Sequence, residues 1–130
     1  MAELQLNDAV MLAGHREDVP EVLRSLDALV IASTRHEGVP QIGLQALATQ
    51  TPVVGSDVGG TPEVIRVNET GRIFPAGDAG ALAQALMAVV NDGAATRRLA
   101  AQGRAVVEAR HSLDAMLDRL EGIYRRALGT

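Results

Sequence analysis

The stretch ALVIASTRHEGVPQIGLQALA, residues 28–48, combines three kinds of sequence in a short span. Its unbroken apolar start, 28–33, is typical of a parallel strand that is buried on both faces. A charged loop with Gly38 and Pro40 follows, and apolar residues in 42–47 then recur at helical spacing. The stretch therefore predicts a strand, a loop and a helix in succession, which is one βα unit of a parallel sheet.

Three further apolar runs predict the other strands. The run VMLAG at 10–14 precedes a helical pattern for which Asp18, with Glu21 three residues later, is the expected N-cap. The run PVVGS at 52–56 leads into a short helical turn, and GRIFP at 71–75 ends at a proline. Alternating strands and helices of this kind predict an α/β fold with a parallel sheet.

From Asp78 onward the sequence shows helical patterns alone. Apolar stripes predict three helices, of which the first ends near Gly93 and the last is capped by Ser112. Glycines and prolines fall at the junctions between elements and do not form a linker. Residues 1–130 are therefore expected to form a single domain, a parallel sheet with flanking helices that ends in three helices.

Composition narrows the classes of function. A formal net charge of -4 with scattered arginines disfavours nucleic acid and anionic membranes as partners. The chain has no cysteine, which excludes disulfides and thiolate chemistry, and its apolar runs are too short to cross a bilayer. Its three histidines lack metal-ligand spacing. We therefore expect a soluble, cytoplasmic protein without a metal site.

Ligands of parallel sheets bind outside the carboxyl ends of the strands. Three loops are expected there, GHRED at 14–18, STRHEGVPQ at 33–41 and SDVGGTPE at 56–63. After Gly38 and Pro40 the first N–H groups of the helix have no intrahelical partner, so an anion such as a phosphate can bind. The ordinary alternative, a loop that merely leads into a helix, stays open at this point.

Two polar residues flank the start of this helix. Glu37 stands in the loop before it, and Gln45 lies in its second turn. A carboxylate accepts hydrogen bonds, whereas a carboxamide both donates and accepts them. Together they suit a pair of vicinal hydroxyls, which sugars present.

Four blocks in order carry a family resemblance: VMLAGHREDVPEVL, ALVIASTRHEGVPQIGLQALA, TPVVGSDVGGTPEVI and TGRIFP. They resemble the C-terminal, nucleotide-sugar-binding half of retaining GT-B glycosyltransferases of family 4, or group 1, and cover nearly the whole chain. The resemblance implies a Rossmann-like domain. It also implies transfer of a sugar from a nucleotide-diphosphate donor to an acceptor, with retention at the anomeric carbon and with no cofactor or metal.

The resemblance further implies roles for individual residues. Glu37 matches an acid near the donor sugar and the reacting centre, and is the expected catalytic residue. Gln45 replaces a second acid that binds the ribose, and its amide lacks a charge-assisted bond worth about 1 kcal/mol. Five residues match the phosphate-facing loop, whose backbone N–H groups bind the donor: Gly38, Val39, Pro40, Gln41 and Ile42.

Four other positions have structural alternatives. Arg16 can reach a phosphate or a base edge, but its acidic neighbours favour a surface ion pair. The turn at 59–63 is expected to let the backbone pass close to the site. Gln50 replaces the family's usual glycine in a turn, and His36 is expected to be an exposed loop histidine.

Parts of the family pattern have no match in this chain. The donor domain of the family begins with two further βα units, which hold an Arg and a Lys for the diphosphate, and an acceptor-binding domain precedes them. We therefore expect a piece of a larger enzyme or a reduced homologue that is inactive alone. The unmatched strands would lie between those at 10–14 and 28–33, so we expect unpaired edges that favour a homodimer or a rearranged first strand.

Three functions stay open on the sequence. The first is the donor-binding part of a retaining glycosyltransferase, which the order of the blocks favours. The second is a GT-B relative that acts on nucleotide sugars by other chemistry, such as epimerisation. The third is a non-catalytic module that kept the fold. The sugar, the nucleotide and the acceptor depend on loop shape and on the unmatched domain.

Overall fold

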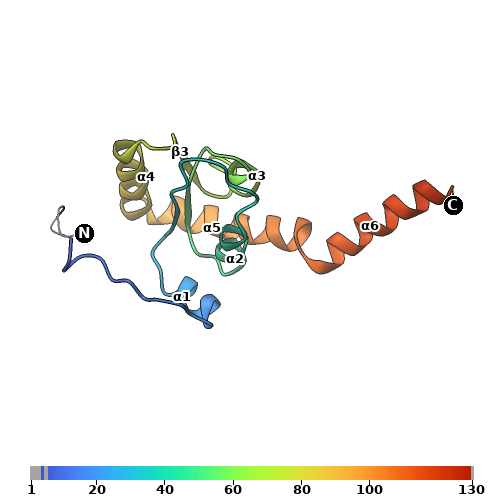
Figure 1. Ribbon diagram of the computed structural model, residues 1–130, viewed down its shortest axis with the longest axis horizontal. Helices are drawn as coiled ribbons and strands as arrows, with labels where there is room; N and C mark the ends of the chain where they lie inside the picture. The colour runs from blue at the N-terminus through green and yellow to red at the C-terminus, as the bar shows by residue number, and fades with distance from the viewer. Residues whose placement is uncertain (1–3, 5, 130) are drawn as a thin grey trace.

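The computed structural model describes residue 4 and residues 6–129, and within them it contains a parallel three-stranded sheet (Figure 1). The strands are β1 (Leu29–Ile31), β2 (Val53–Ser56) and β3 (Arg72–Phe74), in the spatial order β1-β2-β3. Leu29 pairs with Val53, and Val54 pairs with Arg72. The predicted parallel α/β fold and three of its four predicted strands are thus confirmed.

Helices cover both faces of this sheet. On one face α1 (Val19–Arg24), α2 (Gln41–Ala48) and α3 (Thr61–Val64) enclose a core that includes Leu47 and Ile65. On the other face α4 (Ala79–Asn91) packs over Val54 and Phe74. The successive residues Val53 and Val54 of β2 therefore reach two separate cores, as expected for a strand between two layers of helix.

The three predicted C-terminal helices are α4, α5 (Gly93–Arg110) and α6 (Leu113–Leu128). The predicted cap is present, because the Ser112 hydroxyl accepts a hydrogen bond from the Ala115 amide over 3.2 Å. Helix α6 extends away from the body, and none of its residues is buried (Figure 1). Among the described helices, none is both long and apolar enough to cross a membrane.

The strand predicted at 10–14 is wrong. This segment forms no strand, and the side chains of Met11 and Leu12 are 86% and 80% exposed. Figure 1 shows it running past α1, away from the sheet. A strand needs a neighbour to satisfy its backbone hydrogen bonds, and β1 offers a three-residue edge that 10–14 does not reach. The expected rearrangement of the first strand agrees with this outcome.

The prediction that strand 28–33 is buried on both faces is also wrong. The strand shortens to β1, and Val30 is 36% exposed although Ile31 next to it is buried. Alternate residues of a strand face opposite sides of the sheet. Because β1 lies at an edge, the side that Val30 faces is only partly covered.

Candidate functional site

Two loops meet at the carboxyl ends of β1 and β2. The amide of Gly60 donates a hydrogen bond to the carbonyl oxygen of Glu37 over 3.0 Å. A Cβ on Gly59, whose φ is +55°, would lie 1.9 Å from that same oxygen, and a Cβ on Gly60 would lie 2.7 Å from the carbonyl oxygen of Gly38. The loops can approach this closely because both positions are glycine, which confirms that the turn at 59–63 passes close to Glu37.

The Glu37 side chain is held beside the end of β1. The hydroxyl of Ser33, two residues after the strand, donates a hydrogen bond to Oε2 of Glu37, and both residues are half-buried. Within the described residues, Oε1 of this carboxylate has no hydrogen-bond partner. Sequence reasoning missed Ser33, although a hydroxyl four residues before an acid in the same loop was a usable signal.

Helix α2 begins at Gln41, four residues after Glu37. Pro40 is its N-cap residue and no side chain caps the helix, while Gly43 donates its amide to the carbonyl of Pro40 over 3.0 Å. Helix geometry therefore leaves the amides of Gln41 and Ile42 without an intrahelical acceptor. Gly43 also permits close packing, since a Cβ there would lie 3.0 Å from Ile31 of β1. The start of α2 is thus positioned by β1, the strand that precedes the Glu37 loop.

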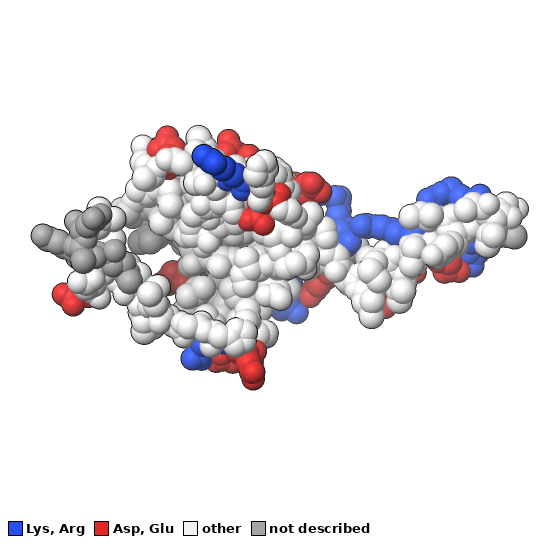
Figure 2. Space-filling model, in the orientation of Figure 1, with Lys and Arg blue, Asp and Glu red and all other residues white. Residues whose placement is uncertain are grey.

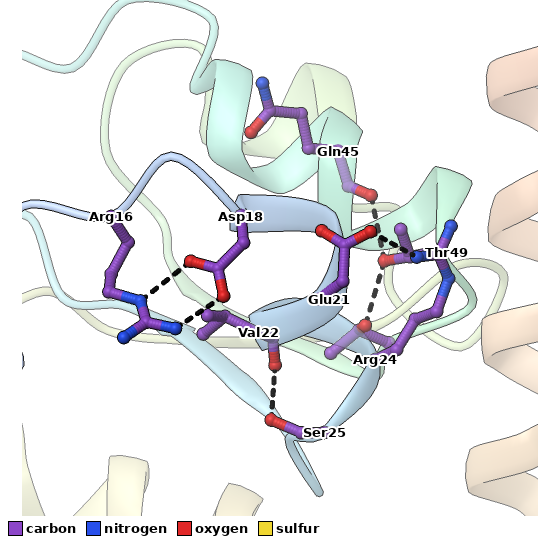
Figure 3. Close-up of polar contacts among 9 residues, drawn as sticks. Arg16, Asp18, Glu21, Val22, Arg24, Ser25, Gln45 and Thr49 are labelled. Carbon is purple, nitrogen blue, oxygen red and sulfur yellow. Dashed lines mark hydrogen bonds and ion pairs between the residues drawn. The ribbon is translucent and has the colours of Figure 1, made fainter.

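Gln45 lies one turn further along α2 and is exposed. Its carbonyl accepts hydrogen bonds from the amide and the hydroxyl of Thr49, each over 3.0 Å. Its side-chain amide extends away from Thr49 (Figure 3). Gln45 is therefore on the same helix as the 38–42 segment, with a carboxamide that is accessible from solvent.

Arg16 lies just before α1, and among the described residues its side chain hydrogen-bonds Asp18 and none of residues 37–45. Its Nε donates to Asp18 over 2.8 Å, and its Nη2 contacts the second oxygen of that carboxylate (Figure 3). This hydrogen bond raises the pKa of Arg16 and lowers the pKa of Asp18. The carboxyl end of α1 is held at the amino end of β2, where the Thr51 hydroxyl donates to the Leu23 carbonyl over 2.8 Å. Arg16 thus forms the surface ion pair that was expected as the structural alternative to ligand binding.

Asp18 is the N-cap residue of α1, as predicted, but its side chain makes no capping hydrogen bond. No side chain accepts from the first amides of this helix, because the Asp18 carboxylate is taken by Arg16. A bidentate guanidinium is a stronger partner for a carboxylate than a single amide is. The S/T/D-x-x-E pattern is present in the sequence, but a nearby arginine outcompetes it.

The edge formed by residues 37–45 has complementary chemistry for a charged sugar derivative. The unpaired amides at the start of α2 suit a phosphate, and the free oxygen of Glu37 suits a hydroxyl. Within residues 4 and 6–129, no three His, Asp or Glu side chains are grouped as metal ligands. The site therefore consists of backbone amides, one carboxylate and one carboxamide.

Similar proteins were found by sequence and by structure. The chain is 28% identical over 121 residues to N-acetyl-alpha-D-glucosaminyl L-malate synthase of Bacillus anthracis, covering 93% of this chain and 32% of the relative. Sucrose-phosphate synthase from Thermosynechococcus elongatus superimposes with a TM-score of 0.89 and 30% identity, covering 98% of this chain and 32% of that one. The chain spans about a third of the length of the curated relatives it matches.

A third similar protein, Anabaena Alr3699/HepE solved in complex with UDP, superimposes with a TM-score of 0.90 at 22% identity and covers 95% of this chain and 34% of its own. This likeness confirms the predicted Rossmann-like fold of the GT-B type. Residues 1–92, more than half of the chain, match the family described as Glycosyl transferases group 1. On the fold and on this match, the chain belongs to the group 1 glycosyl transferases.

Proposed function

We propose that this chain is the donor-binding part of a retaining glycosyltransferase, which transfers a sugar from a nucleotide diphosphate to an acceptor. The observation that carries the proposal is the contact between Gly60 and the Glu37 carbonyl, which fixes the backbone of Glu37 in the loop that leads to the open start of α2. Membership of group 1 supports transfer as the reaction. Among similar structures, Alr3699/HepE was solved with UDP-glucose, which supports a nucleotide sugar as the donor.

In this proposal the donor diphosphate lies against residues 38–42, whose N–H groups, those of every residue but Pro40, donate to it. The amides of Gln41 and Ile42 and the helix dipole offset negative charge there. Gln45, one turn along α2, hydrogen-bonds the ribose with its carboxamide. Arg16 contacts a phosphate or the base, which requires its pair with Asp18 to open.

Transfer breaks the bond between the anomeric carbon and the diphosphate oxygen. The bonding electrons leave with the diphosphate, whose added charge the amides at the start of α2 stabilise. Positive charge develops on the sugar, and the Glu37 carboxylate beside it lowers the energy of that state. The acceptor hydroxyl then bonds to the same face of the anomeric carbon and passes its proton to the departing diphosphate oxygen on that face, so configuration is retained.

A second candidate is a module that kept the fold without binding a donor. Gln45 favours it, because this position is an uncharged amide where the resemblance implies an acid. The ion pair of Arg16 with Asp18 also favours it, since the positive charge of Arg16 is already neutralised. Saturable binding of a nucleotide sugar separates the two candidates, because the module would bind none.

The experiment compares Glu37→Ala with Gln45→Ala in the intact enzyme that contains this chain. The Glu37 variant is expected to lose transfer by two or more orders of magnitude, since its carboxylate adjoins the reacting sugar. The Gln45 variant is expected to lose roughly tenfold or less, since one neutral hydrogen bond is removed. Equal losses in kcat/KM for the two variants would reject these roles.

We also propose that the chain alone transfers no sugar and associates as a homodimer. The first part follows from the implied need for an acceptor domain and a diphosphate clamp, neither of which matches these residues. The second is supported by the outer edge of β1 and by the half-covered Val30, which another chain can pair with and cover. Light scattering that gives a monomer at high protein concentration would contradict the second part.

A further inference from the structure

Two hollows adjoin each other between the start of α2 and the point where α5 meets α6. One, of about 500 Å³, lies between Gln41 of α2 and the first turns of α6. The other, of about 440 Å³, lies between Val39 and Glu63 at the start of α3. Both are lined by the same three residues, which we call the α5–α6 corner: Arg110, His111 and Arg119.

The arginines of the corner differ from those on either side of them. Arg104 earlier in α5 pairs with Glu108 over 2.7 Å, and Arg125 later in α6 pairs with Glu121 over 2.6 Å. Among the described residues, Arg110 and Arg119 have no ion-pair partner. The charges of Arg104 and Arg125 are thus neutralised within their helices, and the two charges at the corner are not.

The corner forms a patch of positive charge next to the loops. Figure 2 shows basic side chains gathered at the neck between the body and α6. Of the described residues that line the two hollows, Glu63 is the one acid, and Arg66 is already paired with Glu69 over 3.2 Å. Positive charge therefore exceeds negative charge along this wall.

The bend between the helices holds the corner in place. The amide of His111 donates to the carbonyl of Val107 over 2.8 Å, which ends α5, and Ser112 caps α6 at the next residue. Arg110 is thus the last residue of α5 and Arg119 lies in the second turn of α6, and His111 and Ser112 alone separate the two helices. A pair of planar guanidinium groups held in this way suits an oxyanion, to which each can donate two hydrogen bonds.

We propose that the α5–α6 corner binds a phosphoryl or carboxylate group of a substrate whose sugar donor lies at residues 37–42. This inference rests on the proposed function. The hollows supply the link, because Val39 and Gln41 line them and also belong to the segment proposed to hold the donor. The oxyanion has two possible sources, the diphosphate of the donor and an acidic group on the acceptor.

The test is an NMR titration of the ¹⁵N-labelled chain with inorganic phosphate, in which sodium chloride keeps the ionic strength constant. Saturable shifts are expected at the amides and side chains of Arg110, His111 and Arg119. Arg119→Gln should weaken phosphate binding at least fivefold. The matched control is Arg126→Gln on the same helix, outside both hollows, and it should leave binding unchanged. Arg119→Lys, which keeps the charge but loses the planar fork, should give an intermediate value.

A second arm repeats the titration with saturating UDP. If phosphate still binds the α5–α6 corner in the presence of UDP, the corner binds an acidic group of the acceptor. If UDP displaces the phosphate, the corner binds the donor diphosphate. No saturable shift at the corner, or equal weakening by Arg119→Gln and Arg126→Gln, would overturn the proposal. Failure of UDP to shift residues 38–42 would instead count against the proposed function, so the two failures are distinguishable.

Discussion

The amide of Gly60 lies 3.0 Å from the carbonyl oxygen of Glu37, and this hydrogen bond joins the loop after β2 to the loop after β1. The backbone on either side of the proposed catalytic carboxylate is therefore set by a glycine 23 positions later in the chain. A side chain at Gly59 or Gly60 would occupy the space that the Glu37 and Gly38 carbonyls fill. The site depends on these two glycines for its shape.

Gly59→Ala tests this dependence. The new Cβ would meet the Glu37 carbonyl, and the residue has a φ of +55°, so we expect a loss of unfolding free energy of about 3 kcal/mol in urea denaturation. The control is Gly77→Ala, which has a φ of +81° but open space around it, and should lose about 1 kcal/mol from backbone strain alone. Equal losses would show that the contact with Glu37 does not constrain the loop.

Gln50→Gly is expected to stabilise the chain. Gln50 has a φ of 60°, in the left-handed region that costs a residue with a Cβ about 1 kcal/mol. Glycine removes this strain, and part of the gain is offset by its greater freedom when unfolded. Gln50→Ala keeps the strain and serves as the control. A melting temperature that fails to rise for glycine relative to alanine would contradict the argument.

Gln45→Glu is expected to tighten binding of the nucleotide sugar modestly in the intact enzyme. A carboxylate accepts stronger hydrogen bonds from ribose hydroxyls than an amide does, which corresponds to about 1 kcal/mol of binding free energy. Calorimetry measures this difference directly. Binding that stays unchanged or weakens would count against a ribose at this position.

The Arg16–Asp18 pair predicts a pH effect. The hydrogen bond from Arg16 lowers the pKa of Asp18, so the pair stabilises the fold above the ordinary pKa of an aspartate, about 3.9. This stabilisation is lost as the pH falls through the lowered value. Arg16→Gln should raise the pKa of Asp18 in an NMR titration of its carboxyl carbon. The control Arg24→Gln, which removes the ion pair between Arg24 and Glu21, should leave the pKa of Asp18 unchanged. An Asp18 pKa that is the same in both variants would show that the hydrogen bond from Arg16 does not lower it.

Local pattern and long-range pairing explain which elements could be predicted. The succession in 28–48 follows from residue spacing alone, so β1, the loop and α2 were predictable. Residues 10–14 have the same apolar character, but a strand also needs a partner, and local spacing carries no information about one. The corner of Arg110 and Arg119 has no motif, because the bend at Ser112 creates it. The sequence predicted that the turn at 59–63 passes close to the site, but it did not predict the hydrogen bond between Gly60 and Glu37.

The most direct test of the account is an NMR titration of the chain with UDP, in which the backbone amides report where the ligand lies. We expect saturable shifts centred on residues 38–42, with Glu37 and Gln45 at the border of the affected region. Glu37→Ala should leave these UDP shifts in place, since its carboxylate is assigned to the sugar and not to the diphosphate. Saturable shifts centred elsewhere in the fold, or none, would contradict a donor site at the start of α2.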